Sequence, residues 1–191
     1  MFPFVRLAKE LLRARRMGRM AQLTDIHTSH HICWPWDLDA FAELNNGRTL
    51  TLFDLGRLAM GYRSGLIDAL RSEGWGLTMA GASVRYRQRI RAFERFRMTS
   101  RAVCWDDKFF YLEQAMWKRD GTCAHHVLYR AAVTDRTGLV TPMRVAAAMQ
   151  VPAASPPMPD WIAAWIKADT ARPWPPMQDS VAPPRLHAAA S

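Results

Sequence analysis

The sequence predicts an α+β domain in which one antiparallel sheet wraps around a single long helix. Two observations support this: a helical pattern about 25 residues long, and a following series of four or five strands separated by short turns. Strands that follow one another through short turns pair most easily as antiparallel neighbours. A helix that is apolar around much of its girth needs cover on several sides, and a curled sheet can supply it.

The elements begin with a basic helical segment over residues 1–22 and one strand near residues 29–35. The long helix is predicted over residues 46–71, because Leu52, Leu55 and Ala59 begin a run with the spacing of one helical face. Asn45 or Asn46 can cap its start. Asn46-Gly47 followed by alternating residues also resembles a hairpin, but the helical spacing continues for far longer.

After Gly74 and Gly76 the hydrophobic period changes to two. This period is typical of strands, and it predicts them over residues 77–90, 96–105, 109–118, 123–133 and 139–149. The pairs Trp161/Trp165 and Ile162/Ile166 indicate a short helix near residues 159–167. The predicted segments are therefore a basic N-terminal helix (1–22), a central domain (23–150), a C-terminal helix (151–170) and a proline-rich tail (171–191).

The composition disfavours several classes of protein: membrane-spanning, exported, disulfide-bonded and zinc-binding proteins. Of the 191 residues, 49% are hydrophobic and 23% are charged, which is enough apolar material for a packed core. No stretch approaches the roughly 18 apolar residues of a membrane-spanning helix, and the start lacks the apolar centre of a signal peptide. The three cysteines have no C-x-x-C spacing, which disfavours a disulfide framework or a zinc site. We therefore expect a cytoplasmic protein with no metal or other cofactor.

The net charge of +9 is concentrated in two segments. Residues 1–20 carry six cationic side chains and one glutamate, and residues 85–101 carry seven arginines and one glutamate. The rest of the chain is slightly acidic, so we expect no nucleic-acid partner. Residues 1–20 could instead lie on an anionic membrane, although packing as an ordinary terminal helix is the more common outcome for such a segment.

One segment of the sequence points to a particular protein family more specifically than the order of helices and strands does. The run Trp36-Asp37-Leu38-Asp39 through Asn45-Asn46-Gly47-Arg48 resembles the D-x-D and N-N-x-R signature of hotdog-fold thioesterases. Further similar stretches are Arg85-Tyr86-Arg87, Phe93-Glu94-Arg95-Phe96 and residues 105–113. Together they resemble the 4-hydroxybenzoyl-CoA thioesterase-like group and its member-six-like branch over residues 20–150. The resemblance implies a hotdog fold.

The resemblance also implies hydrolysis of an acyl-CoA or acyl-carrier-protein thioester, in a pocket formed between the subunits of a homodimer or tetramer. It places the catalytic nucleophile or base at Asp39. It places the substrate-binding oxyanion donors at Asn45, Asn46 and Gly47. These roles are chemically reasonable, because a carboxylate can attack or activate water and free amides at a helix start stabilise an oxyanion.

Three positions depart from the family pattern, and one of them is Thr49, where related member-six-like chains carry tyrosine. Phe41 and Glu43 stand where many relatives place asparagine and histidine. Glu43 can act as a second catalytic carboxylate, with Asp39 orienting water, or the site has lost a catalytic group and only binds acyl chains. Asp37 and Asp39 can also simply close a turn. The sequence leaves these alternatives open.

Arg85, Arg87 and Arg89, continued by Arg91, alternate along the predicted strand 77–90 and would share one face. They are candidates for binding the phosphates of CoA, since arginine forks fit phosphate well. A solvated outer face is the competing interpretation. The sequence also contains two adjacent histidine pairs, which we interpret as strand or core residues rather than metal ligands: His30, His31, His125 and His126.

Overall fold

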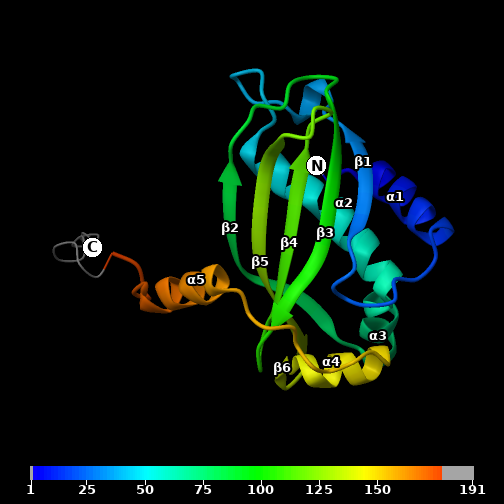
Figure 1. Cartoon of the computed structure of the whole chain (residues 1–191), viewed down its shortest axis with the longest axis vertical. Coiled ribbons are helices and arrows are strands. Elements are labelled where there is room, and N and C mark those ends of the chain that lie inside the picture. Colours follow the sequence, from blue (N-terminus) through cyan, green and yellow to red (C-terminus); the bar gives the residue numbers. More distant parts are fainter. Residues whose placement is uncertain (1, 178–191) are drawn as a thin grey trace, which may run out of the picture. The chain divides into compact units, whose positions relative to one another are not determined.

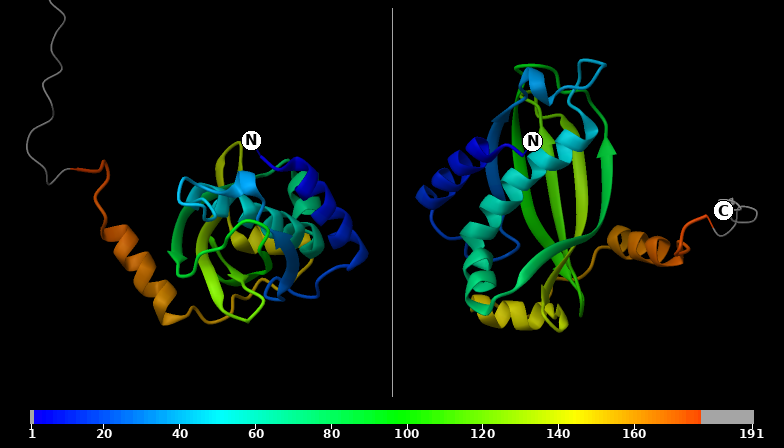
Figure 2. Two further views of the ribbon diagram at one scale, coloured as in Figure 1. Left: turned by 90° about the horizontal axis from the view of Figure 1, so that it is seen from above. Right: turned by 180° about the vertical axis from the view of Figure 1, so that it is seen from behind.

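The computed structural model describes residues 2–177, which form two compact units, one up to Pro156 and one from Pro157 on. In the first unit an antiparallel sheet curls around the long helix α2 (Asn46–Ser64) (Figures 1 and 2). This confirms the predicted α+β hotdog fold. The second unit contains the helix α5 (Asp160–Ala171), close to its predicted position. Residues 178–191 of the predicted tail lie outside the described residues.

The sheet has the strand order β1-β3-β4-β5-β2, and the short β6 also pairs with β5. All pairs are antiparallel, so β1 and β2 form the two outer edges. The strands are β1 (His27–Ile32), β2 (Gly76–Tyr86), β3 (Arg95–Trp105), β4 (Phe110–Trp117), β5 (Cys123–Asp135) and β6 (Gly138–Val140).

The core lies between α2 and the concave face of the sheet. Leu52, Phe53 and Leu55 of α2 are fully buried against strand residues such as Met116. At Gly56 the helix approaches β3 so closely that a Cβ would lie 2.6 Å from the Met98 sulfur and 2.8 Å from the Ser100 hydroxyl. A glycine is therefore required where the helix meets the sheet.

The predicted helix over residues 46–71 is two helices in the structure. Gly65 adopts a left-handed conformation (φ 83°), which ends α2 and allows α3 (Leu66–Glu73) to start in a new direction. The N-terminal helix α1 (Phe4–Arg16) packs against α2. It lies on the side of α2 near β1 (Figure 2).

The predicted strand over residues 139–149 is wrong beyond Val140. Residues Pro142–Met149 form the helix α4. The Thr141 hydroxyl accepts a hydrogen bond from the Arg144 amide, and Pro142 occupies the first turn, where its missing N–H costs nothing. Val145, Ala146 and Met149 are buried on one helical face, so the apolar residues have helical rather than strand spacing.

The predicted strand over residues 77–90 is also too long, because β2 ends at Tyr86. Arg87, Arg89 and Arg91 lie in the following loop. They therefore do not share a strand face with Arg85, and the alternation argument does not apply to them. Within residues 2–177, no helix is long and apolar enough to span a bilayer.

Candidate functional site

The start of α2 presents unused backbone donors. Asn45 is the N-cap: its Oδ1 accepts a hydrogen bond from the Arg48 amide at 3.0 Å. The preceding chain is held in place by the Asn45 amide, which donates to the Asp37 carbonyl. Among the described residues, the amides of Asn46 and Gly47 have no hydrogen-bond acceptor. Together with the positive end of the helix dipole, they can bind a partial negative charge.

A polar cavity of about 170 Å³ lies beside this helix start. It is lined by the loop before α2, the end of β2, the loop after it and one residue of β5: Glu43, Leu44, Asn46, Tyr86, Arg87, Gln88, Arg89, Ile90 and His125. The cavity brings together four of the candidates from the sequence, namely Glu43, Asn46, Arg87 and Arg89.

The remaining candidates do not line this cavity. Asn45 and Gly47 flank Asn46 at the helix start, and Arg85 is exposed near the end of β2. Asp39 lies in the preceding loop and is half-buried. Four of the eight candidates therefore line the cavity beside the helix start, and the other four do not.

Glu43 contributes a carboxylate to the cavity. Its Oε2 atom lies 2.7 Å from the Arg89 Nε, which forms an ion pair with it. Oε2 is itself buried and has no aligned hydrogen-bond donor among the described residues, while the side chain as a whole is 30% exposed. Because Oε2 is buried against Arg89, the other carboxylate oxygen, Oε1, is the one that can accept a proton from a water molecule.

Asp39 shapes the loop that carries Glu43. Its Oδ1 accepts hydrogen bonds from the amides of Phe41 (2.8 Å) and Glu43 (3.4 Å). Its own amide donates to the Glu43 carbonyl at 2.9 Å, and Ala42 completes the turn with a positive φ of 55°. In this arrangement the Asp39 carboxylate stabilises a tight turn. Its predicted catalytic role stays a prediction.

Asp37 anchors the same region from inside. Its carboxylate is fully buried and accepts hydrogen bonds from Arg6 Nη1 (2.7 Å), Arg48 Nε (2.6 Å) and the Trp34 amide (3.0 Å). Burial raises the pKa of Asp37, but the bonds from Trp34, Arg48 and Arg6 outweigh it, so the pKa falls below its ordinary value. One carboxylate thus ties α1 and α2 to the loop before the helix.

Three further residues lie beside the helix start. The Tyr86 hydroxyl donates to the Asn46 carbonyl at 3.3 Å. The Thr49 hydroxyl lies 3.3 Å from Nδ1 of His125, and the rings of Tyr86 and His125 meet edge to face. Burial lowers the pKa of His125, which favours a neutral imidazole there. No local pattern in the sequence places these three residues together. Tyr86 pairs with His125 across β2 and β5, and this pairing follows only from the register of the two strands.

A second carboxylate on α2 was also not singled out from the sequence. Asp54 forms an ion pair with Arg57, one turn further along the helix. The Arg57 guanidinium lies 4.3 Å from the centre of the Tyr129 ring. Burial raises the pKa of Asp54, and Arg57 opposes this shift. Two charged residues three apart in an otherwise apolar helical stretch are the signal that could have identified this pair.

The described part of the chain contains no group of three metal-binding side chains. His31 and His125 are both buried, in agreement with their interpretation as strand or core residues. At the helix start the structure gathers a carboxylate, free backbone amides, two arginines and a histidine whose pKa burial lowers.

Comparison with known proteins assigns the chain to a family that has this fold. Residues 33–166 match the family model of the thioesterase-like superfamily. The match covers more than half of the chain, and the chain belongs to this superfamily. The assignment agrees with the resemblance read from the sequence.

A curated relative is the protein THEM6 of Xenopus laevis, 41% identical over 111 residues, which is 58% of this chain and 54% of that protein. The chain thus spans about half the length of this relative. Among solved structures, a DHNA-CoA thioesterase from Staphylococcus aureus superposes with a TM-score of 0.56 at 15% identity, covering 76% of this chain and 91% of that one. The protein SAV2348 of the same organism, solved in complex with CoA, has a TM-score of 0.55 at 15% identity and covers 78% and 86%. At this identity the structures establish the fold.

Proposed function

We propose that this protein hydrolyses acyl-CoA thioesters at the start of α2. The observation that carries the proposal is the meeting of a carboxylate, Glu43, with the start of a helix whose Asn46 and Gly47 amides are unused. Hydrolysis of a thioester requires both a base for water and donors for the developing oxyanion. Membership of the thioesterase-like superfamily supports the same reaction class.

In the proposed mechanism, the thioester carbonyl oxygen accepts hydrogen bonds from the amides of Asn46 and Gly47. Glu43 takes a proton from a water molecule, which attacks the carbonyl carbon. The tetrahedral intermediate collapses as the carbon–sulfur bond breaks, and the thiolate takes up the proton held by Glu43. The products are a carboxylic acid and a free thiol, so atoms and charges balance.

In this scheme Asp39 positions Glu43 through the turn that its carboxylate holds. Arg87 and Arg89 are the candidates for contacting the phosphates of CoA, because both line the cavity and arginine binds phosphate through paired hydrogen bonds. Arg85 lies on the neighbouring strand end and is a weaker candidate. One structural neighbour is a DHNA-CoA thioesterase and another was solved with CoA, which supports CoA rather than a carrier protein as the thiol.

We also propose that a second copy of the chain completes the site. β2 is an edge strand whose outer side is unpaired within the described chain, and its end contributes Tyr86 to the cavity wall. A cavity of about 170 Å³ is small for an acyl chain with its pantetheine arm. Pairing through β2 would deepen it, and sedimentation equilibrium of the purified chain should therefore give twice the monomer mass or a multiple of it.

A second candidate function is binding of acyl thioesters without hydrolysis. The observation in its favour is that Asp39, where the resemblance implies the nucleophile or base, uses its Oδ1 for hydrogen bonds to its own loop. Phe41, at another position where relatives carry a polar group, is 79% exposed. On this account the helix start would still bind the thioester carbonyl, and no acid would be released.

The two functions separate in one assay. Short aliphatic, long aliphatic and aromatic acyl-CoA thioesters, with an acyl-carrier-protein thioester, are incubated with the wild type and with Asp39→Asn. We expect release of free thiol from at least one CoA substrate. If Asp39 acts only through the turn, Asp39→Asn lowers the rate about tenfold or less, whereas a loss of a hundredfold or more would place Asp39 in the chemistry. A wild type that binds acyl-CoA but releases no thiol would support the binding function instead.

A further inference from the structure

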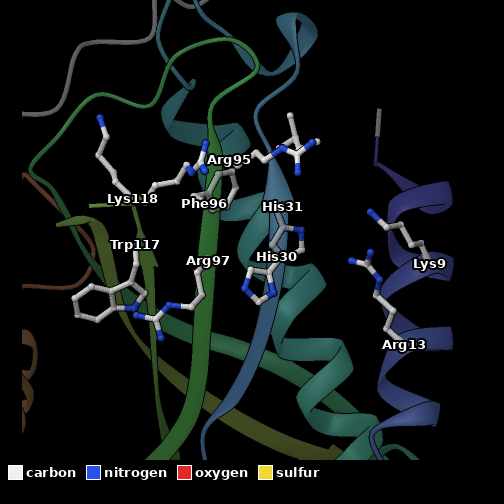
Figure 3. Close-up of a pocket in the computed structure, with 11 residues that line it drawn as sticks. Lys9, Arg13, His30, His31, Arg95, Phe96, Arg97, Trp117 and Lys118 are labelled. Carbon is white, nitrogen blue, oxygen red and sulfur yellow. The ribbon is translucent and has the colours of Figure 1, made fainter. Parts of the chain in front are cut away.

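A second polar groove lies away from the helix start, across the outer face of β1, β3 and the end of β4 (Figure 3). It has a volume of about 610 Å³ and shares no lining residue with the cavity at Glu43. We call it the basic groove, because six cationic side chains line it and no carboxylate does: Lys9, Arg13, Arg95, Arg97, Lys118 and Arg119.

Four of these six cations have no carboxylate partner in the described part of the chain. Arg13 is paired with Glu10 at 3.2 Å, and Lys118 with Glu94 at 2.9 Å. Lys9, Arg95, Arg97 and Arg119 form no ion pair among residues 2–177. Figure 3 shows Lys9 and Arg13 reaching from α1 toward β1, with Arg97 and Lys118 on the other side of β1. Such a concentration of one sign of charge in a concave surface attracts a polyanion.

The floor of the groove is partly aromatic. His30, Arg97 and Trp117 stand opposite one another in register across β1, β3 and β4. The Trp117 Nε1 donates to the Thr99 hydroxyl at 2.9 Å, which fixes the plane of the indole ring. The Arg97 guanidinium lies 5.5 Å from the centre of that ring. A fixed, half-exposed indole with cations around it can stack a planar base while phosphates contact the arginines.

From this arrangement we propose that the basic groove binds a nucleotide carrying two or more phosphates. Four unpartnered cations match the charge of a nucleoside triphosphate or of the phosphorylated nucleotide end of CoA. Arginine forks at Arg95 and Arg119 suit phosphate oxygens, and Trp117 suits the base. The proposal does not depend on thioester hydrolysis, because none of its residues belongs to the cavity at Glu43.

The test is isothermal titration calorimetry of the full chain at fixed ionic strength with ATP, CoA and inorganic tripolyphosphate. The variant Arg95→Glu/Arg119→Glu reverses two exposed cations that form no ion pair and no side-chain hydrogen bond within residues 2–177. Its control, Arg71→Glu/Arg136→Glu, makes the same charge change at exposed arginines outside the groove. We expect nucleotide affinity to fall at least thirtyfold in the groove variant and less than threefold in the control.

The variant Trp117→Leu tests whether the indole ring of Trp117 stacks on the nucleotide base. It should weaken nucleotide binding about tenfold and leave tripolyphosphate affinity within a factor of two, so the tripolyphosphate measurement also confirms that the variant is folded. Binding of ATP or of CoA that the groove variant loses supports the proposal, and the relative affinities identify a free nucleotide or the nucleotide end of CoA as the ligand. CoA binding that the groove variant keeps belongs to Arg87 and Arg89 at the cavity and counts against the groove. The proposal is overturned if neither nucleotide binds with a Kd below about 1 mM. It is also overturned if the control loses affinity as much as the groove variant, or if Trp117→Leu has no effect on nucleotides.

Discussion

At the residue scale, Asp37 holds the loop before α2 in place. It is fully buried and accepts hydrogen bonds from Arg6 and Arg48, which belong to two different helices. A buried carboxylate with two guanidinium partners is strongly coupled to them, because loss of the negative charge leaves two cations uncompensated. The loop that holds Asp39 and Glu43 begins directly after it.

Asp37→Asn should therefore destabilise the fold by about 3 kcal/mol or more, even though the side chain keeps its size. Urea denaturation at pH 7 measures this. The control is Asp68→Asn, which removes a carboxylate from an exposed pair with Arg19 at 3.6 Å and should cost less than about 0.5 kcal/mol. Equal losses in the two variants would mean that Asp37 has no special structural role.

Also at the residue scale, His31 links stability to pH. Burial, with the nearby cations Arg6 and Lys9 of α1, lowers its pKa to about 3 in the folded protein, and His30 and Arg13 act in the same direction. The unfolded chain binds a proton near pH 6.5. Between these values the unfolded state holds more protons, so stability rises with pH and is lost as the pH falls.

We predict that His31 alone accounts for a loss of about 2 kcal/mol in unfolding free energy between pH 7 and pH 5. Denaturation of the wild type and of His31→Gln at pH 7, 6 and 5 measures the difference in slope. His30→Gln, which changes the exposed neighbour, is the control and should keep the wild-type slope. If the His31→Gln stability falls with pH as steeply as that of the wild type, the buried neutral imidazole is not the cause.

At the scale of elements, the packing of α2 on β3 depends on Gly56, which has no side chain at the point of contact. A Cβ at Gly56 would lie within 3 Å of Met98 and Ser100, both of which are buried. At Gly61, on the same helix, the nearest atom to an added Cβ is a carbon of Ile67 at 3.6 Å, an ordinary contact. The two glycines therefore differ in packing and share the same secondary structure.

Gly56→Ala should destabilise the protein by roughly 1–3 kcal/mol, because overpacking exceeds the gain in helix propensity. Gly61→Ala should be neutral or stabilising by up to about 1 kcal/mol, since alanine favours the helix and fits the space. Thermal unfolding of both variants checks the pair. A Gly56→Ala protein as stable as Gly61→Ala would show that β3 gives way without cost.

The elements also show what a sequence can predict. The apolar girth of the stretch around Leu52 and the alternation in residues 96–133 predict a sheet wrapped around one helix, because both patterns persist over many residues. The hotdog fold itself was assigned from the resemblance to a family. The strand prediction is wrong for Pro142–Met149, because a short apolar run fits a strand and a helix equally well. The kink at Gly65 was missed because the apolar spacing continues through it.

At the scale of the whole molecule, the candidate site combines residues that a local sequence pattern can indicate with residues that only the fold brings together. The run from Asp37 to Gly47 pointed to the helix start through its resemblance to a family. That His125 and Tyr86 reach the same place follows from the register of β2 and β5, which no local pattern encodes. The division between Asp39 in the turn and Glu43 at the cavity depends on loop geometry, including the positive φ of Ala42.

The measurement that tests the central proposal most directly is the kcat/KM of Glu43→Gln on the best acyl-CoA substrate of the wild type. The glutamine keeps the size of the side chain and cannot take a proton from water. We predict that kcat falls at least a hundredfold while KM changes less than threefold, as expected for loss of a general base. Glu73→Gln, an exposed acid at the end of α3, should match the wild type. A Glu43→Gln protein with wild-type kcat would contradict the proposal that Glu43 is the base at the start of α2.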